Sequence, residues 1–133
     1  MQKLKTNIDL GLLVLRVGIG LTFCYVYGYP KLMGGTEKWA QIGSVMAKIG
    51  VPCIPEFWGF MAALAEGLGG LLLILGLGTR TAAGFLAFTM VMASVHHITS
   101  GDPLFKSAHA MEMAAVFLAL IFAGSGKYAL RPS

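Results

Sequence analysis

Residues 62–80 read AALAEGLGGLLLILGLGTR, and this stretch decides the fold class. Before the closing Arg80, its one charged residue is Glu66, and segment 57–79 contains no other charge. A helix of about 20 apolar residues is long enough to cross the roughly 30 Å hydrocarbon core of a bilayer. The stretch lacks the alternation of apolar and polar residues that is typical of a barrel strand. We therefore predict a transmembrane helix over residues 57–78.

Three other stretches have the same character, and we predict that they also cross the membrane. They cover residues 8–29, 81–99 and 108–125. The short glycine-containing turn before Arg80 makes the second and third spans antiparallel neighbours. Residues 36–49 predict an amphipathic helix that ends at Gly50 and is too short to span, so we expect it to lie at the membrane interface. The predicted fold class is all-α: a single membrane domain, residues 1–133, forming a four-helix bundle.

The composition of the whole chain supports this class. Of 133 residues, 56% are hydrophobic and only 12% are charged, with a mean hydropathy of +0.75. Soluble domains are about one-quarter charged, so a soluble enzyme is excluded, and a chain this apolar is not disordered. The expected partner is the lipid bilayer, and we expect no nucleic-acid partner. The basic residues favour cytoplasmic termini by a small margin, with Arg80 in the shortest loop on that side.

Three charged residues lie inside predicted spans: Arg16, Glu66 and Glu112. Each costs at least about 2.5–3.5 kcal/mol at the centre of a span, so each needs a partner. Small residues at Gly59 and Gly67 flank Glu66 on its helix and predict that Glu66 points into the bundle. We expect a structural ion pair between Arg16 and Glu66, because a guanidinium can hold a carboxylate in a bidentate fork.

Helix packing in the fourth span is expected to use a second row of small residues, Ala115, Ala119 and Ala123. In the same span His109 lies one helical turn before Glu112. Glu112 would remain as a second carboxylate beside this imidazole.

Further polar side chains are expected at a similar depth in the outer half of the bundle, namely Tyr27, His96 and His97. Three interpretations of this cluster stay open: a structural hydrogen-bonded network, a proton-linked redox site for a quinone, and a metal site that combines His96 or His97 with residues of the fourth span. Side chains of adjacent residues on a helix diverge by about 100°. We therefore expect that His96 and His97 do not face one ion, and no metal ligand is assigned.

Four segments together resemble the DoxX family. They are Leu15-Arg16-Val17-Gly18, Tyr27-Gly28-Tyr29-Pro30-Lys31-Leu32, the stretch 62–80 quoted above, and Gly124-Ser125-Gly126-Lys127-Tyr128. The resemblance implies a small four-helix membrane protein of the kind found in bacteria and archaea, and we expect it in the bacterial inner membrane. Some members resemble subunits of thiosulfate:quinone oxidoreductases or quinol oxidase preparations, and others are associated with membrane oxidoreductase complexes in redox stress. The resemblance also marks Arg16, Lys31, Glu66 and Glu112 as the family's polar positions. Tyr27 stands where the family often has His.

These observations predict a membrane subunit of a quinone-linked redox system. We expect Glu66, Glu112 and His109 to carry its chemistry. The residues expected to line the ligand site are Tyr27, Lys31, His96 and His97. The chain has no recognisable flavin, haem or iron–sulfur motif, so electrons would come from a partner oxidoreductase.

The alternatives are a non-catalytic anchor or assembly subunit and a membrane protein that handles a small solute or a metal. The electron donor, the formation of a homo-oligomer and a bond between Cys24 and Cys53 stay open, although two unpaired thiols are favoured.

Overall fold

The computed structural model describes residues 2–132, and within them the side chains of residues 8–132. The described residues form helices and no strand. In chain order the helices are α1 (Gln2–Leu21), the π-helix η1 (Thr22–Gly28), α2 (Tyr29–Leu32), α3 (Gly35–Gly43), the 3₁₀ helix η2 (Ser44–Ile49), α4 (Pro55–Leu75), α5 (Thr79–Thr99) and α6 (Leu104–Ala123). Lys3 and Lys5 are among the basic residues near the termini that favour the predicted orientation, and their side chains lie outside the described ones.

Four stretches are long and apolar enough to cross a membrane. They are Ile8–Leu32, Pro55–Leu75, Thr79–Thr99 and Leu104–Ala123. The predicted all-α class with four spanning helices is therefore confirmed. The largest difference in bounds is at the fourth span, which begins at 104 and not at 108. The first span is one continuous rod in which α1, η1 and α2 follow each other without a break in helical geometry.

Glycines bring this first rod into backbone contact with α4. A Cβ atom added to Gly28 would lie 2.4 Å from Gly67 Cα, and one added to Gly20 would lie 2.5 Å from Gly70 O. Close approach of this kind is how helices associate in lipid, where burial of apolar surface gives no advantage. The two pairs also fix the antiparallel register, in which the end of the first rod lies beside the middle of α4. The prediction that the small-residue face of α4 is buried is confirmed.

The connection between the first two spans folds back against α4. A Cβ on Gly59 would lie 1.7 Å from Trp39 O, so α3 and α4 also meet backbone to backbone. The Trp39 ring packs edge-on against Phe60, with centroids 5.0 Å apart, and its Nε1 donates a hydrogen bond to Lys31 O at 2.9 Å. Gly50, with φ of +89°, ends η2 as predicted.

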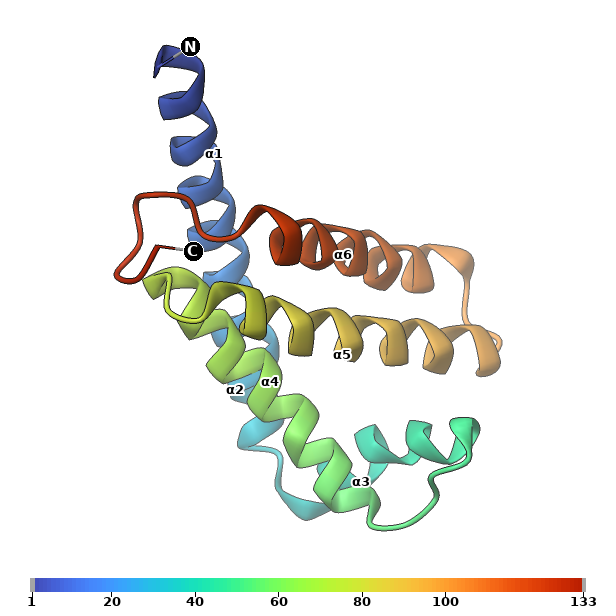
Figure 1. Ribbon diagram of the computed structural model, residues 1–133. Helices are drawn as coiled ribbons and strands as arrows, with labels where there is room; N and C mark the ends of the chain where they lie inside the picture. Colours follow the sequence, from blue (N-terminus) through green and yellow to red (C-terminus); the bar gives the residue numbers. More distant parts are fainter. Residues whose placement is uncertain (1, 133) are drawn as a thin grey trace.

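The helices are arranged as a fork (Figure 1). α5 and α6 lie side by side, whereas α4 and the first rod run together in a different direction. The two pairs meet at the base of the fork, where the buried side chains of Phe23, Leu73, Leu86 and Phe117 belong to one core. The rings of Phe23 and Phe117 meet edge to face with centroids 5.1 Å apart. Away from this base the pairs diverge, and α3 and η2 lie on the open side.

The packing face of α6 differs from the predicted one. Ala115, Ala119 and Ala123 are exposed, and α6 instead packs through the row that contains Ala110, Ala114 and Phe117. The reason is that the aromatic ring of Phe117 fills the core between the helices, which the small alanines of the neighbouring row would leave void. A small-residue row is therefore a weaker guide to the buried face than a large apolar residue.

Candidate functional site

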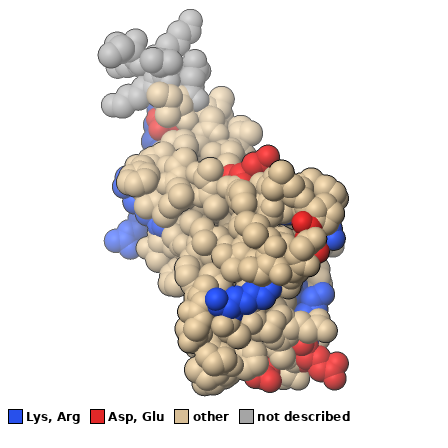
Figure 2. All heavy atoms as spheres, turned by 90° about the vertical axis from the view of Figure 1, so that its right-hand side faces the viewer, with Lys and Arg blue, Asp and Glu red and all other residues tan. Residues whose placement is uncertain are grey.

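A cavity of about 980 Å³ lies inside the fork, between the α3–η2 segment, α4 and α5. Its walls are mainly apolar and include Val45, Met46, Trp58, Leu72, Phe85 and Met92. Four ionisable side chains also line it: Lys31, Glu66, His96 and His97. The molecular face on the open side of the fork is largely uncharged, with separate basic and acidic groups among uncharged residues (Figure 2). The fork therefore encloses an apolar space that has ionisable groups at its wall.

Glu66 forms an ion pair with Lys31 at this wall. Lys31 Nζ lies 2.8 Å from both carboxylate oxygens of Glu66. The Glu66 side chain is 2% exposed and that of Lys31 is 29% exposed, so the carboxylate is enclosed while the ammonium reaches the cavity opening. The prediction that Glu66 points inward is confirmed, but its expected pairing with Arg16 is wrong.

Arg16 is buried elsewhere and bonds to backbone carbonyls. Its Nη1 donates to Leu73 O at 2.9 Å, and its Nη2 donates to Tyr128 O in the C-terminal segment. Leu73 lies seven residues beyond Glu66, about 10 Å along the helix. In the antiparallel register Arg16 falls opposite the C-terminal end of α4, where free carbonyls and the negative end of the helix dipole attract a cation. The expected Arg16–Glu66 pair was wrong because the register between the first rod and α4 places Arg16 beyond Glu66. The depth of each residue in the membrane did not reveal that register.

The C-terminal segment closes this end of the molecule. The N–H groups of Leu130 and Arg131 donate to Leu75 O at 3.1 Å and Gly76 O at 3.3 Å. A Cβ on Gly76 would meet Arg16 Nη1 at 2.7 Å, so this position has no room for a side chain. Arg16 is therefore a structural clamp between α4 and the residues that follow α6.

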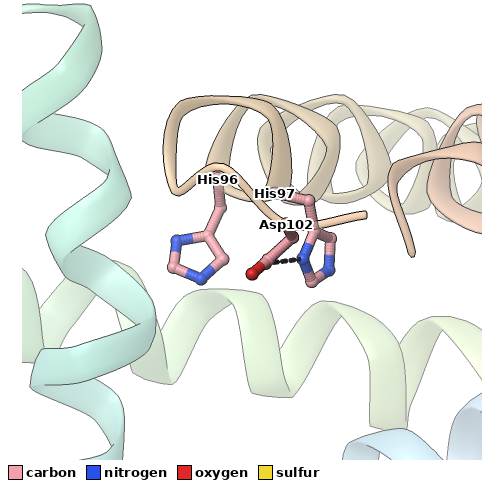
Figure 3. Close-up of side chains that lie close together, drawn as sticks. All are labelled: His96, His97 and Asp102. Atoms are coloured by element: carbon pink, nitrogen blue, oxygen red, sulfur yellow. Dashed lines mark hydrogen bonds and ion pairs between the residues drawn. The ribbon is translucent and has the colours of Figure 1, made fainter. Parts of the chain in front are cut away.

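His96 and His97 lie together at the open end of α5, beside Asp102 (Figure 3). The imidazole rings of His96 and His97 meet edge to face with centroids 5.4 Å apart, although the sequence predicted divergent side chains. His97 Nδ1 and Asp102 Oδ2 are 2.8 Å apart. α5 ends at Thr99, and Gly101, with φ of +74°, turns the chain so that Asp102 N–H donates to His97 O. The hydrogen bond from His97 lowers the pKa of Asp102.

The other predicted site residues lie on a second, smaller groove or on the outer surface. His109 and Tyr27 line a groove of about 370 Å³ between the first rod and α6, with ring centroids 6.1 Å apart. Glu112 is exposed on α6 and has no hydrogen bond or ion pair among the described residues. The structure thus does not bring Glu66, Glu112 and His109 together. Of the predicted lining residues, Tyr27 lies apart from Lys31, His96 and His97.

Two residues of the open end were missed by the sequence reasoning. Asp102 joins the histidines, and the Gly101-Asp102-Pro103 turn, five residues after His97, was the available signal. Lys48 of η2 reaches across to the end of α5, where its Nζ donates to Thr99 Oγ1. No sequence feature indicated that second contact. Cys24 and Cys53 are free thiols, as favoured.

The family model for DoxX matches residues 11–98, which run from α1 to the end of α5. The chain belongs to the DoxX family. The matched region contains Arg16, Lys31, Glu66 and both histidines of α5, whereas Asp102 and all of α6 follow it. Together with the four apolar helices, this membership makes the chain a multi-pass membrane protein in contact with lipid.

This DoxX protein is also similar to a curated protein of Bacillus subtilis (strain 168) with the name "Putative oxidoreductase CatD". The two are 29% identical over 92 residues, which is 69% of this chain and 63% of the relative. The aligned part is thus less than two thirds of the relative's length. No solved structure matches the chain.

Proposed function

We propose that this DoxX protein is a membrane subunit of a redox system and that it binds a quinone in the cavity inside the fork. The observation that carries the proposal is the Lys31–Glu66 pair, with its carboxylate enclosed, at the wall of an apolar cavity of about 980 Å³. Ligand pockets commonly measure about 300–1,000 Å³ and combine apolar walls with a few placed polar groups. A quinone has this division, with a polar head group on an apolar tail.

The two parts of the site match the two parts of such a ligand. The apolar walls accommodate an isoprenoid tail from the bilayer because they place no unpaired polar group against it. At the wall Lys31 has three donor hydrogens, and its contact with Glu66 leaves donor capacity for one quinone carbonyl oxygen. The enclosed Glu66 carboxylate holds the ammonium in place, so Lys31 is the group that contacts the ligand and Glu66 the one that positions it.

Reduction of a quinone needs two electrons and two protons, which convert its two carbonyl oxygens into hydroxyls. We propose that a partner oxidoreductase supplies both electrons, since this chain has no recognisable flavin, haem or iron–sulfur motif. The protons come from water, and the 29% exposure of Lys31 gives a path from the cavity opening to its ammonium. The oxidoreductase name of the B. subtilis relative supports the redox assignment.

We further propose the cytoplasmic membrane of a bacterial cell as the location, with both termini on the cytoplasmic side. Arg80, in the turn between α4 and α5, supports this orientation through the excess of basic residues in short cytoplasmic loops. The Lys31–Glu66 pair and the cavity opening would then lie toward the outer side.

The test is the quinone content of the protein purified in mild detergent. The wild type is expected to retain up to one quinone per chain, and Lys31→Met and Glu66→Gln to retain at least about tenfold less, a loss of about 1.4 kcal/mol of binding free energy. Glu112→Gln is the matched control because its carboxylate lies outside the cavity. Equal retention by all four proteins, or extraction of phospholipid alone, would overturn the quinone proposal.

A second candidate function, that of an assembly subunit, is favoured by the outer face of α6. Glu112 is exposed within a spanning helix, with Ala115 and Ala119 exposed on the same face. A carboxylate facing lipid costs about 2.5–3.5 kcal/mol, and small residues beside it allow close approach of another helix. Under this proposal Glu112→Leu abolishes co-purification with the partner oxidoreductase while quinone retention is unchanged.

A further inference from the structure

The end of α5 presents three metal-ligating side chains at one place. His96, His97 and Asp102 each offer a ligand atom, and these atoms all lie within 4.8 Å of one another. Among the described residues no second group of three such side chains comes as close. The cluster lies where α5 meets the loop to α6 (Figure 3), and its two histidines line the cavity.

We propose that His96, His97 and Asp102 bind one divalent transition-metal ion. Two imidazoles and one carboxylate are a ligand set that suits Zn²⁺ and Fe²⁺, with positions left open for water or another ligand. Hard cations such as Mg²⁺ and Ca²⁺ prefer oxygen ligands, and two nitrogen ligands of three disfavour them. This site does not depend on quinone binding.

The present geometry needs only side-chain adjustment to hold an ion. Ligand atoms at about 2.0–2.1 Å from a tetrahedral metal lie about 3.3 Å from each other. His97 Nδ1 and Asp102 Oδ2 are already 2.8 Å apart. Since all three ligand atoms lie within 4.8 Å of one another, His96 needs to approach by at most about 1.5 Å. Its ring is exposed, so this rotation displaces no packed neighbour.

The backbone holds the ligands near each other without the ion. The N–H of Asp102 donates to His97 O at 3.1 Å, so the carboxylate is tied to the last turn of α5. Because the loop is fixed in this way, less conformational entropy is lost when a metal binds.

Two lysines beside the cluster oppose a cation. Lys48 Nζ lies 3.5 Å from Ser100 Oγ and interacts electrostatically with His96. Lys106 interacts electrostatically with Asp102. One carboxylate faces these two positive charges. We therefore expect removal of the Lys48 charge to strengthen metal binding, an effect that adventitious binding elsewhere on the protein would not show.

The test uses the full chain in detergent after treatment with a chelator, titrated with Co²⁺ as a spectroscopic probe and with Zn²⁺ as its competitor. The wild type is expected to bind one Co²⁺ per chain, with visible d–d absorption that Zn²⁺ removes. His97→Ala and Asp102→Asn should weaken binding at least about tenfold. His96→Ala should do the same, and because His96 is exposed this variant keeps the fold.

The matched control is His109→Ala, which removes an exposed histidine of α6 that is outside the cluster. It should bind Co²⁺ like the wild type, and Lys48→Met should bind it more tightly. The proposal is overturned if the wild type binds no stoichiometric metal, or if His96→Ala and His109→Ala weaken binding equally. Quinone retention by Asp102→Asn separates the two proposals, because Asp102 does not line the cavity and its loss leaves the Lys31–Glu66 pair intact.

Discussion

Two buried ionic side chains are held in opposite ways along α4, Arg16 at its C-terminal end and Glu66 at its middle. At the C-terminal end, Arg16 is fully enclosed and bonds to two backbone carbonyls, and the C-terminal segment covers it. In the middle of α4, Glu66 pairs with Lys31, whose ammonium is partly exposed at a cavity. Arg16 is thus shielded from any ligand, whereas Glu66 lies beside a cavity that can hold a ligand.

This difference separates structure from function within one helix pair. A charge whose hydrogen bonds are made by fixed carbonyls holds the fold together and has little capacity for anything else. A charge whose partner is partly exposed at a cavity can exchange that partner for a ligand. Substitutions at the closed end should therefore affect stability most, and substitutions at the open end should affect ligand retention most.

The largest loss of stability is expected where α4 touches the first rod. Gly28→Ala places a methyl group 2.4 Å from the Gly67 backbone and should destabilise the protein by about 3 kcal/mol. Gly18→Ala is the control, because nothing lies within 4 Å of its Cβ position, and it should be neutral or stabilising by up to about 1 kcal/mol. Thermal unfolding in detergent measures both, and equal midpoints would refute the close backbone contact.

Next in size is the loss of the Arg16 clamp. Arg16→Met removes the donor to Tyr128 O and one of the two donors to Leu73 O, and it should cost about 2 kcal/mol. Release of the C-terminal segment should accompany it, which limited proteolysis after residue 123 would detect. Wild-type resistance to protease in this variant would show that Arg16 does not hold the segment.

A smaller stability change is expected at the open end. Glu66→Gln keeps the shape of the side chain and leaves Lys31 able to turn toward the cavity opening, so the cost should be about 1 kcal/mol. Its quinone retention should nevertheless fall at least about tenfold. A variant that unfolds as readily as Arg16→Met would place Glu66 with the structural charges instead.

The smallest stability effect is expected from filling the cavity itself. Ala62 lines the cavity and is only half-buried, so Ala62→Phe should change stability by no more than about 0.5 kcal/mol. The larger ring occupies ligand space and should reduce quinone retention. Retention equal to that of the wild type would mean that the ligand lies elsewhere.

The class of fold and the inward direction of Glu66 could be predicted because both depend on local composition. Scarcity of charge predicts spanning helices, and glycines beside a carboxylate mark a packed face. The partner of Glu66 depends on the register between two helices, which no local pattern specifies. The contacts of Gly28 with Gly67 set that register, and matching the two glycines in the sequence would have placed Lys31 beside Glu66.

Two further differences arise from assumptions of regular geometry. His96 and His97 were expected to diverge, but at the last turns of α5 their rings converge beside Asp102, which the following loop supplies. On α6, Phe117 and not the alanine row determines the buried face. The prediction from ideal helix geometry thus failed at the end of α5, and the prediction from small residues failed on α6 because a large side chain fills the core.

The most direct test of the contrast between Arg16 and Glu66 is to measure quinone content and thermal midpoint together for wild type, Arg16→Met and Glu66→Gln. The account predicts that Glu66→Gln loses the quinone while its midpoint stays near that of the wild type. It predicts that Arg16→Met has a clearly lower midpoint but retains quinone below the temperature at which it unfolds. Loss of quinone in the folded Arg16→Met protein with full retention in Glu66→Gln would contradict the account.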